Sequence, residues 1–192
     1  MNELDAAEAA FHDGGVVLYP TTTLWGLGGD ASSPHVIDKI ADIKGRSSTV
    51  PFLVLVADAD AIEGLACRSD LAQQLIDRFW PGPLTLLLPA GPNAPTSLVG
   101  PEGLVGIRQA QHLAPRGLLE RTGGWLISTS ANRHGEPAPS TLDSVGPRVR
   151  EQVDAILSTG PPPGGLPSTI VAVEESVRLV RQGAIPWSQI TR

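Results

Sequence analysis

Two apolar runs of this chain end in hydroxyl groups, which makes them the first candidates for chemistry. In residues 16–29 an apolar run is followed by three threonines and then by glycines, which we expect to form a polar, glycine-rich turn. In residues 125–132 a similar run ends in hydroxyls and an amide. Because open α/β sheets bind ligands at strand ends, two strands with polar ends indicate one shared site. The alternative for the threonines alone is a turn in which their hydroxyls bond to the local backbone.

Four cations are placed where an anion could be bound. Lys44 and Arg46 follow a helical pattern that closes on a glycine, while Arg108 and Arg181 each end an apolar run. Arginine suits carboxylates and phosphates because two parallel N–H donors can meet two oxygens. For each of these residues, a solvated position at a helix or strand end is the more common alternative. Cations and hydroxyls together predict a site for an anionic ligand.

Familiar catalytic and nucleotide-binding signatures are missing from the sequence. It contains no G-x-x-x-x-G-K-[ST] phosphate loop, no G-x-S-x-G elbow and no G-x-G-x-x-G fingerprint, so a nucleotide would bind in a less common way. A single cysteine, Cys67, excludes an internal disulfide and a cysteine-based zinc site. The four histidines lack metal-ligand spacing, so we expect no built-in transition metal.

Composition indicates an ordinary globular protein. The chain has 192 residues, 41% apolar and 18% charged, most simply one domain with a sizeable core. Its net charge of -6 argues against a surface devoted to nucleic acid or membrane. The acidic amino terminus lacks the features of a signal peptide, and the apolar runs are too short to cross a bilayer. We therefore expect a cytoplasmic protein with no membrane partner.

Short apolar runs alternate with helical patterns, which predicts an α/β fold. Strands are expected over residues 16–19, 51–56, 84–88, 104–108, 125–129, 155–158, 169–173 and 178–181. Helices are expected over residues 4–12, 34–44, 70–79, 113–121 and 142–149. Connections of mixed length favour a single-domain, twisted, mixed open sheet with helices on its faces. Residues 90–103 and 161–165, rich in proline and glycine, read as connectors or lids over a site.

Seven motifs, taken in order, resemble the signatures of the YrdC/Sua5 family. They are PTTTLWGL (residues 20–27), KGR (44–46), FWPGPLT (79–85), VGIR (105–108), SAN (130–132) with Gly135, PSTI (167–170) and RQG (181–183). The likeness covers residues 14–190 and implies one YrdC-like domain over 1–192, enclosing a concave basic cavity. In length the chain resembles the short bacterial (TsaC-type) members that lack an extra carboxy-terminal domain.

The resemblance implies a reaction and a set of partners. L-threonine, bicarbonate or CO2, and ATP with Mg²⁺ would give threonylcarbamoyl-AMP and pyrophosphate, the work of a nucleotidyltransferase. The adenylate would serve the t6A modification of tRNA at position 37, with tRNA and the proteins of the t6A transferase complex as partners. Such chemistry needs no protein nucleophile, because fixed cations and magnesium stabilise the departing pyrophosphate.

The resemblance also assigns roles to individual residues. Threonine would be held by Thr23, Arg108, Ser128 and Ser168. ATP would be held by Lys44, Arg46, Ser130, Asn132 and Arg181. Lys44 and Arg46 are the expected catalytic pair, and we expect both to be partly exposed in the cavity.

Three positions depart from the family pattern and keep other functions open. Trp25 stands where the family usually has tyrosine, and Val50 and Leu55 stand where polar residues commonly contact ATP and threonine. One alternative is therefore a paralogous enzyme that uses a different amine or carbamoyl donor. The other is a non-catalytic RNA-binding module of the same fold, which the acidic composition disfavours.

Overall fold

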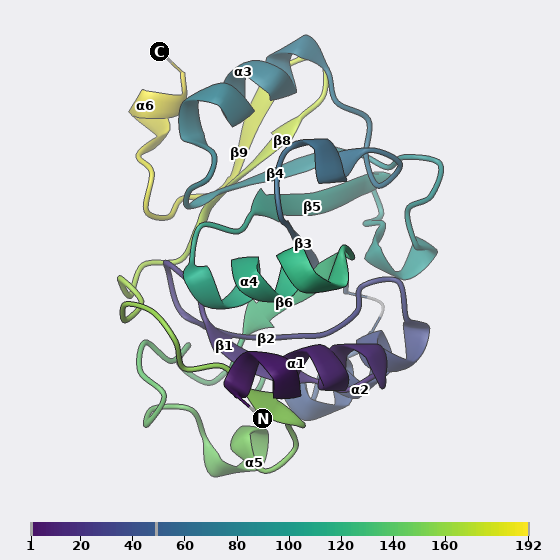
Figure 1. Cartoon of the computed structure of the whole chain (residues 1–192). Coiled ribbons are helices and arrows are strands. Elements are labelled where there is room, and N and C mark those ends of the chain that lie inside the picture. Colours follow the sequence, from purple (N-terminus) through teal and green to yellow (C-terminus); the bar gives the residue numbers. More distant parts are fainter. Residues whose placement is uncertain (1, 49, 192) are drawn as a thin grey trace.

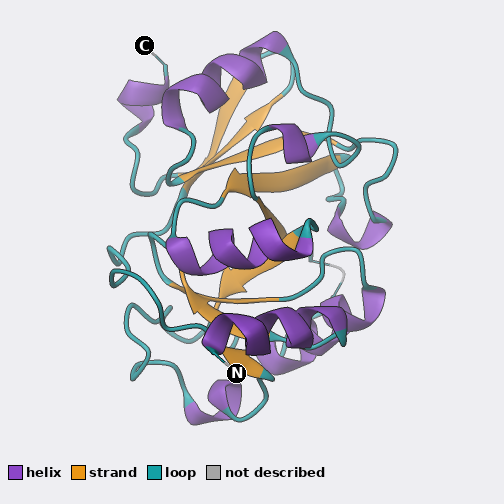
Figure 2. Ribbon diagram, in the orientation of Figure 1, coloured by secondary structure: helices purple, strands orange, loops and turns teal. Residues whose placement is uncertain are grey.

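In residues 2–48 and 50–191, the part of the chain that the computed structural model describes, nine strands form one sheet (Figures 1 and 2). Their order is β7-β1-β2-β6-β3-β5-β4-β8-β9. The strands are β1 (Val17–Pro20), β2 (Trp25–Gly28), β3 (Leu53–Val56), β4 (Leu84–Pro89), β5 (Leu104–Gln109), β6 (Leu126–Ser130), β7 (Ala155–Ile156), β8 (Thr169–Val173) and β9 (Val177–Arg181). The pairs β1–β7, β3–β5 and β4–β8 are parallel, and the other five pairs are antiparallel. The predicted mixed open sheet is confirmed.

The helices begin and end where local chemistry dictates. They are α1 (Glu3–His12), α2 (Pro34–Lys44), α3 (Asp70–Phe79), α4 (Leu113–Thr122), and the short α5 (Pro147–Arg150) and α6 (Trp187–Ile190). Side chains of Asn2, Ser33, Ser69 and His112 accept bonds from the first-turn N–H groups of α1 to α4. Gly45, in the left-handed conformation at φ 63°, ends α2. No helix in the described residues is long and apolar enough to cross a membrane.

The two faces of the sheet are covered by different helices. One face forms the larger core with α2 and α3, while α1 and α4 lie together on the opposite face (Figure 1). Alternation along β6 sends Ile127 into the larger core and Leu126 into the smaller one under α1 and α4. Ser128, two residues on, therefore shares the face of Leu126 and lines a pocket there.

The glycine-rich segment after the threonines is a strand, so its interpretation as a turn was wrong. Residues 25–28 form β2, which pairs with β1 in antiparallel register, Pro20 opposite Trp25. Gly28 is needed for close packing rather than for a turn, because a Cβ there would overlap the carbonyl oxygen of Ile127 and lie 2.7 Å from the phenol oxygen of Tyr19. The polar turn is confined to the residues between the two strands.

Three further elements are shorter than predicted. The strand expected over residues 51–56 begins only at Leu53. The helix expected over residues 142–149 exists only as α5, beginning at Pro147. Upstream, the hydroxyls of Thr141 and Ser144 bond to each other's backbone N–H groups, an arrangement that competes with helix formation. The strand expected over residues 155–158 ends at Ile156, and the Ser158 N–H donates to the carboxylate of Glu3 instead.

Candidate functional site

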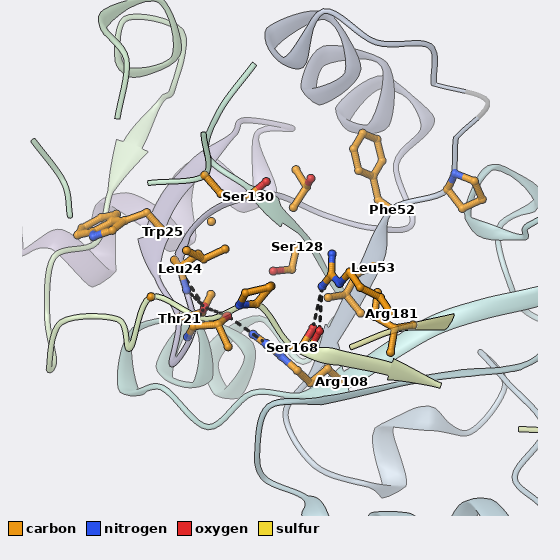
Figure 3. A pocket seen from close by; sticks show the side chains of 18 of the residues that line it. Thr21, Leu24, Trp25, Phe52, Leu53, Arg108, Ser128, Ser130, Ser168 and Arg181 are labelled. Atoms are coloured by element: carbon orange, nitrogen blue, oxygen red, sulfur yellow. Dashed lines mark hydrogen bonds between the residues drawn. The ribbon is translucent and has the colours of Figure 1, made fainter. Parts of the chain in front are cut away.

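A pocket of about 430 Å³ lies where the polar ends of β1 and β6 come together (Figure 3). It receives side chains from both polar strand ends, as the sequence predicted, together with side chains from β5, β9 and the loops around them. Its polar lining consists of Thr21, Thr23, Arg46, Arg108, Ser128, Thr129, Ser130, Ser168 and Arg181. Among the predicted site residues, Lys44 and Asn132 do not line it.

The turn between β1 and β2 is organised by Thr21 and presents Thr23. The Thr21 hydroxyl donates to the Leu24 carbonyl (2.8 Å) and accepts from the N–H groups of Thr23 and Leu24 (both 3.1 Å). The hydroxyl of Thr21 therefore bonds to the local backbone of the turn, which is the alternative that the sequence analysis left open. The Thr23 hydroxyl lies 2.9 Å from that of Thr21 and accepts from Arg108, which places it at the pocket wall.

Arg108 is a buried cation without a carboxylate beside it. Only 4% of the residue is exposed, and its Nη1 donates to the Thr23 hydroxyl at 3.3 Å. Burial lowers the pKa of Arg108 to about 10, a net result that includes an opposing effect of the Tyr19 phenol and a smaller lowering by the charge of Arg181. In the described residues, no Asp or Glu lines this pocket. The site therefore has positive charge available for an anion.

A β-bulge sets the direction of Arg181. In the β8–β9 pairing, Leu179 lies opposite Val171, yet Arg181 lies opposite Ile170, so Val180 is an extra residue. An unbroken ladder would pair Val180 with Ile170 and turn Arg181 to the other face. Because of the bulge, Arg181 faces the pocket, where its Nη2 donates to the Ser168 carbonyl at 3.0 Å. Partial burial lowers the pKa of the guanidinium.

The hydroxyl of Ser168 is held by a residue that the sequence analysis did not select. Thr85, on β4 and 1% exposed, places its hydroxyl 2.9 Å from that of Ser168, which is 4% exposed. Arg181 Nη2 lies 3.4 Å from the same Ser168 hydroxyl. The only sequence signal was the position of Thr85 at the end of the FWPGPLT motif. That motif acts structurally here, since the Trp80 indole donates to the Leu84 carbonyl at 2.7 Å.

Lys44 differs from its expected exposure. It is 5% exposed, and its Nζ donates to the carbonyls of Ser130 (2.6 Å) and Asn132 (2.8 Å). Burial, followed by the like charge of Arg46, lowers its pKa to about 8. The prediction of a partly exposed Lys44 was therefore wrong, because the end of α2 packs against the segment after β6. Through these two hydrogen bonds, Lys44 links the end of α2 to the Ser130–Asn132 segment.

Asn132 is directed into its own loop. Its Nδ2 donates to the carbonyls of Arg133 (3.0 Å) and Glu136 (2.7 Å), while its buried Oδ1 has no partner in the described chain. Ser130, two residues earlier, does line the pocket. The SAN motif thus contributes one side chain to the pocket wall and one to the conformation of the loop behind it.

Arg46 is the cation of the KGR motif that reaches the pocket. Its Nη2 donates to the Val50 carbonyl at 3.2 Å, and its guanidinium lies 4.1 Å from the ring centroid of Phe52. Its Nε is buried and has no hydrogen-bond partner in the described chain. Phe52 also lines the pocket, and sequence patterning marked it only as an apolar residue of the strand expected over residues 51–56.

The three departures from the family pattern have different consequences. Leu55 is fully buried in the smaller core, and Val50 is 48% exposed; neither lines the pocket. Trp25 does line the pocket, and Figure 3 shows it at the left of the view, on the side opposite Arg181. Trp25 is therefore the departure that changes the pocket wall.

The proline- and glycine-rich segment over residues 161–165 closes onto the threonine turn. The N–H groups of Gly164 and Gly165 donate to the carbonyls of Thr22 (3.0 Å) and Thr23 (2.8 Å). Gly165 lines the pocket, so this loop is part of its wall.

Comparisons with known proteins agree with one another. A family model named Sua5_yciO_yrdC, described as telomere recombination, matches residues 9–183. Threonylcarbamoyl-AMP synthase of Bacillus subtilis is 34% identical over 98% of this chain, which spans 55% of that relative. The protein of the same name from Stenotrophomonas maltophilia is 35% identical over 80% of this chain and 84% of its own length. The crystal structure of Pyrococcus abyssi Sua5 complexed with L-threonine matches with a TM-score of 0.90 at 29% identity, covering 97% of this chain and 56% of that one.

Proposed function

Since the chain belongs to the Sua5/YciO/YrdC family, we propose that it is an L-threonylcarbamoyladenylate synthase, a nucleotidyltransferase. The reaction would convert L-threonine, bicarbonate and ATP into threonylcarbamoyl-AMP, pyrophosphate and water. The relatives named threonylcarbamoyl-AMP synthase support this proposal, as does the likeness to a structure that holds L-threonine.

The observation that carries the proposal is the buried guanidinium of Arg108 with no carboxylate beside it in the described pocket. A cation taken out of water without a counter-charge is unfavourable in the free protein. A bound anion would remove that cost. Arg46 and Arg181 line the same pocket, so the site suits a substrate set that brings in both a carboxylate and phosphates.

The threonine end of the site is assigned to Thr23, Arg108, Ser128 and Ser168. Arg108 and the Thr23 hydroxyl already contact each other, so a carboxylate bound there would meet a guanidinium and a hydroxyl together. Ser168, held by Thr85, supplies a further hydroxyl on the same side of the pocket. The three hydroxyl groups can donate to carboxylate or carbamate oxygens and accept from an amine.

The nucleotide end is assigned to Arg46, Ser130 and Arg181, with Lys44 and Asn132 acting from behind the wall. Lys44 binds the two carbonyls that shape the Ser130–Asn132 segment and so fixes the Ser130 side chain that lines the pocket. Magnesium would enter as the ATP complex, because the described pocket lining offers no carboxylate that suits a resident magnesium ion. The metal would neutralise charge on the phosphates.

The chemistry proposed for this pocket depends mainly on positioning. The threonine amine adds to CO2 and loses a proton to form a carbamate. A carbamate oxygen then attacks the α-phosphorus of ATP. The bond between that phosphorus and the oxygen bridging to the β-phosphate breaks, and pyrophosphate leaves with its electron pair. Arg46 and Arg181 would stabilise the charge that develops on the departing group. The loop over residues 161–165, bound to the threonine turn, would help to exclude water from the reactive carbamate.

The product would supply the t6A modification of tRNA at position 37. A mixed anhydride of a carbamate and AMP is an activated acyl donor, so the proteins of the t6A transferase complex are the proposed recipients. A cytoplasmic location, where ATP and tRNA meet, is part of the same proposal.

Pyrophosphate release by the purified protein tests the proposal. With ATP, MgCl2 and bicarbonate present, release should require L-threonine, and Arg108→Met should need a higher L-threonine concentration for the same rate. Release that is indifferent to L-threonine, or that prefers another amine, would assign the pocket to a different carbamoyl-adenylate. No release at all would leave a binding role.

A further inference from the structure

Phe52 lies directly beneath the guanidinium of Arg46. The ring centroid is 4.1 Å from the Arg46 Cζ atom, and Phe52 is only 2% exposed. Phe52 precedes β3 and lines the pocket; in Figure 3 its ring points away from Ser128 and Arg181. An aromatic face at this distance attracts a guanidinium electrostatically and covers one face of it.

The remaining contacts of Arg46 leave its orientation nearly fixed. The Nη2 atom donates to the carbonyl of Val50 at 3.2 Å and lies 3.5 Å from that of Pro51. The stacked ring holds the plane of the guanidinium, and the carbonyls hold one of its corners. The Nε atom is buried without a partner in the described chain, and the Arg46 side chain lines the pocket.

Burial makes this orientation costly to maintain without the ring. Desolvation lowers the pKa of Arg46, so the charged form is already disfavoured in its surroundings. An aliphatic side chain of similar size would fill the space beneath the guanidinium but would offer it no negative face. The aromatic ring therefore attracts the guanidinium electrostatically, which apolar packing alone would not do.

We propose that Phe52 is a positioning residue for nucleotide binding, which holds the guanidinium of Arg46 at the pocket wall, where it would meet the phosphates of ATP. This inference rests on the proposed function, in which Arg46 contacts the nucleotide. Phe52 has no group that could bind a phosphate itself. Its effect on ATP passes through Arg46.

Calorimetric titration of the full chain with ATP and MgCl2 tests this role. Phe52→Leu should weaken ATP binding about five- to thirtyfold, the factor expected for losing a partly desolvated cation–π contact. Phe52→Tyr keeps the aromatic face and should bind ATP about as well as the wild type. L-threonine affinity should be the same in all three proteins, because threonine is assigned to residues on the Arg108 side.

A double-mutant cycle separates positioning from general packing. In an Arg46→Met background, Phe52→Leu should have no further effect on ATP affinity. A packing role predicts the same loss in both backgrounds. Phe79→Leu is the matched control, since it removes the contact between Arg78 and Phe79, 4.9 Å apart and away from the pocket, and should leave ATP affinity unchanged.

The outcomes distinguish this inference from the function on which it rests. If the wild type does not bind ATP with MgCl2, the proposed function fails. If the wild type binds ATP and Phe52→Leu binds it equally well, only the role of Phe52 is overturned. Should Phe52→Leu not fold, Phe52→Met against Phe52→Tyr gives the same comparison of an aliphatic with an aromatic side chain.

Discussion

The guanidinium of Arg108 donates to the hydroxyl of Thr23 across 3.3 Å, joining the end of β5 to the turn after β1. These residues are 85 positions apart in the sequence, and both are buried. The contact satisfies one N–H of a cation that has no carboxylate beside it in the described pocket. A neutral hydroxyl leaves the positive charge free for a ligand, which a carboxylate in its place would not.

Replacing Arg108 should separate function from stability. Arg108→Met removes an uncompensated buried charge, so the free energy of unfolding should stay the same or rise. The KM for L-threonine should rise about 10- to 100-fold, the loss expected for a charge-assisted hydrogen bond. Denaturant unfolding and steady-state pyrophosphate release measure the two effects. A strongly destabilised variant would mean that Arg108 serves the fold.

Lys44 should make stability depend on pH in the alkaline range. Its pKa falls from an ordinary 10.5 to about 8 on folding. Between these values the unfolded chain holds a proton that the folded chain has lost, so stability contributed by this group rises with pH. From pH 7 to pH 10 the wild type should gain roughly 1–3 kcal/mol relative to Lys44→Met.

Urea unfolding at several pH values checks this dependence. Lys39→Met, at an exposed ion pair with Asp154, is the control and should not reproduce the change. Equal pH dependence in the wild type and in Lys44→Met would show that the lysine is not desolvated as its burial indicates.

Gly28 should tolerate no side chain. Gly28→Ala places a Cβ against the Ile127 carbonyl and the Tyr19 phenol, so we expect a loss of about 2–3 kcal/mol. Gly146→Ala is the control: a Cβ there meets nothing within 4 Å, and the change should stay within about 0.5 kcal/mol. Similar stability of the two variants would contradict the tight packing of β2 against β6.

Thr85 should affect threonine through Ser168. Thr85→Val keeps the shape but removes the hydroxyl that lies 2.9 Å from that of Ser168, at a cost of about 1 kcal/mol of stability. We expect the KM for L-threonine to rise about fivefold with little change in the KM for ATP. A parallel change in both constants would indicate a general loss of structure instead.

Strand alternation and helix capping were readable from the sequence, and they placed most of the fold correctly. The runs that became β4, β5, β6 and β8 are apolar with clear ends, and α2 and α3 begin at serines that cap them. β2 was missed because its glycines match a turn pattern locally. Glycine is needed in β2 because Tyr19 and β6 approach it closely, and such contacts between segments distant in the sequence leave no local pattern.

The site was predictable to the extent that it depends on strand ends. Polar residues after β1 and within β6 do meet in one pocket. The direction of Arg181 depends on a bulge, and the burial of Lys44 depends on how α2 meets the segment after β6. Neither is encoded in local residue pattern. Thr85 and Phe52 act through contacts that only the assembled sheet creates.

Mass spectrometry of the adenylate product is the decisive test of the proposed threonylcarbamoyl-AMP synthase activity. The purified protein would be incubated with ATP, MgCl2, isotope-labelled bicarbonate and L-threonine. We expect an adenylate with the mass of threonylcarbamoyl-AMP that carries the labelled carbon and forms only when L-threonine is present. An adenylate that lacks the label or contains another amine, or ATP left intact under these conditions, would contradict it.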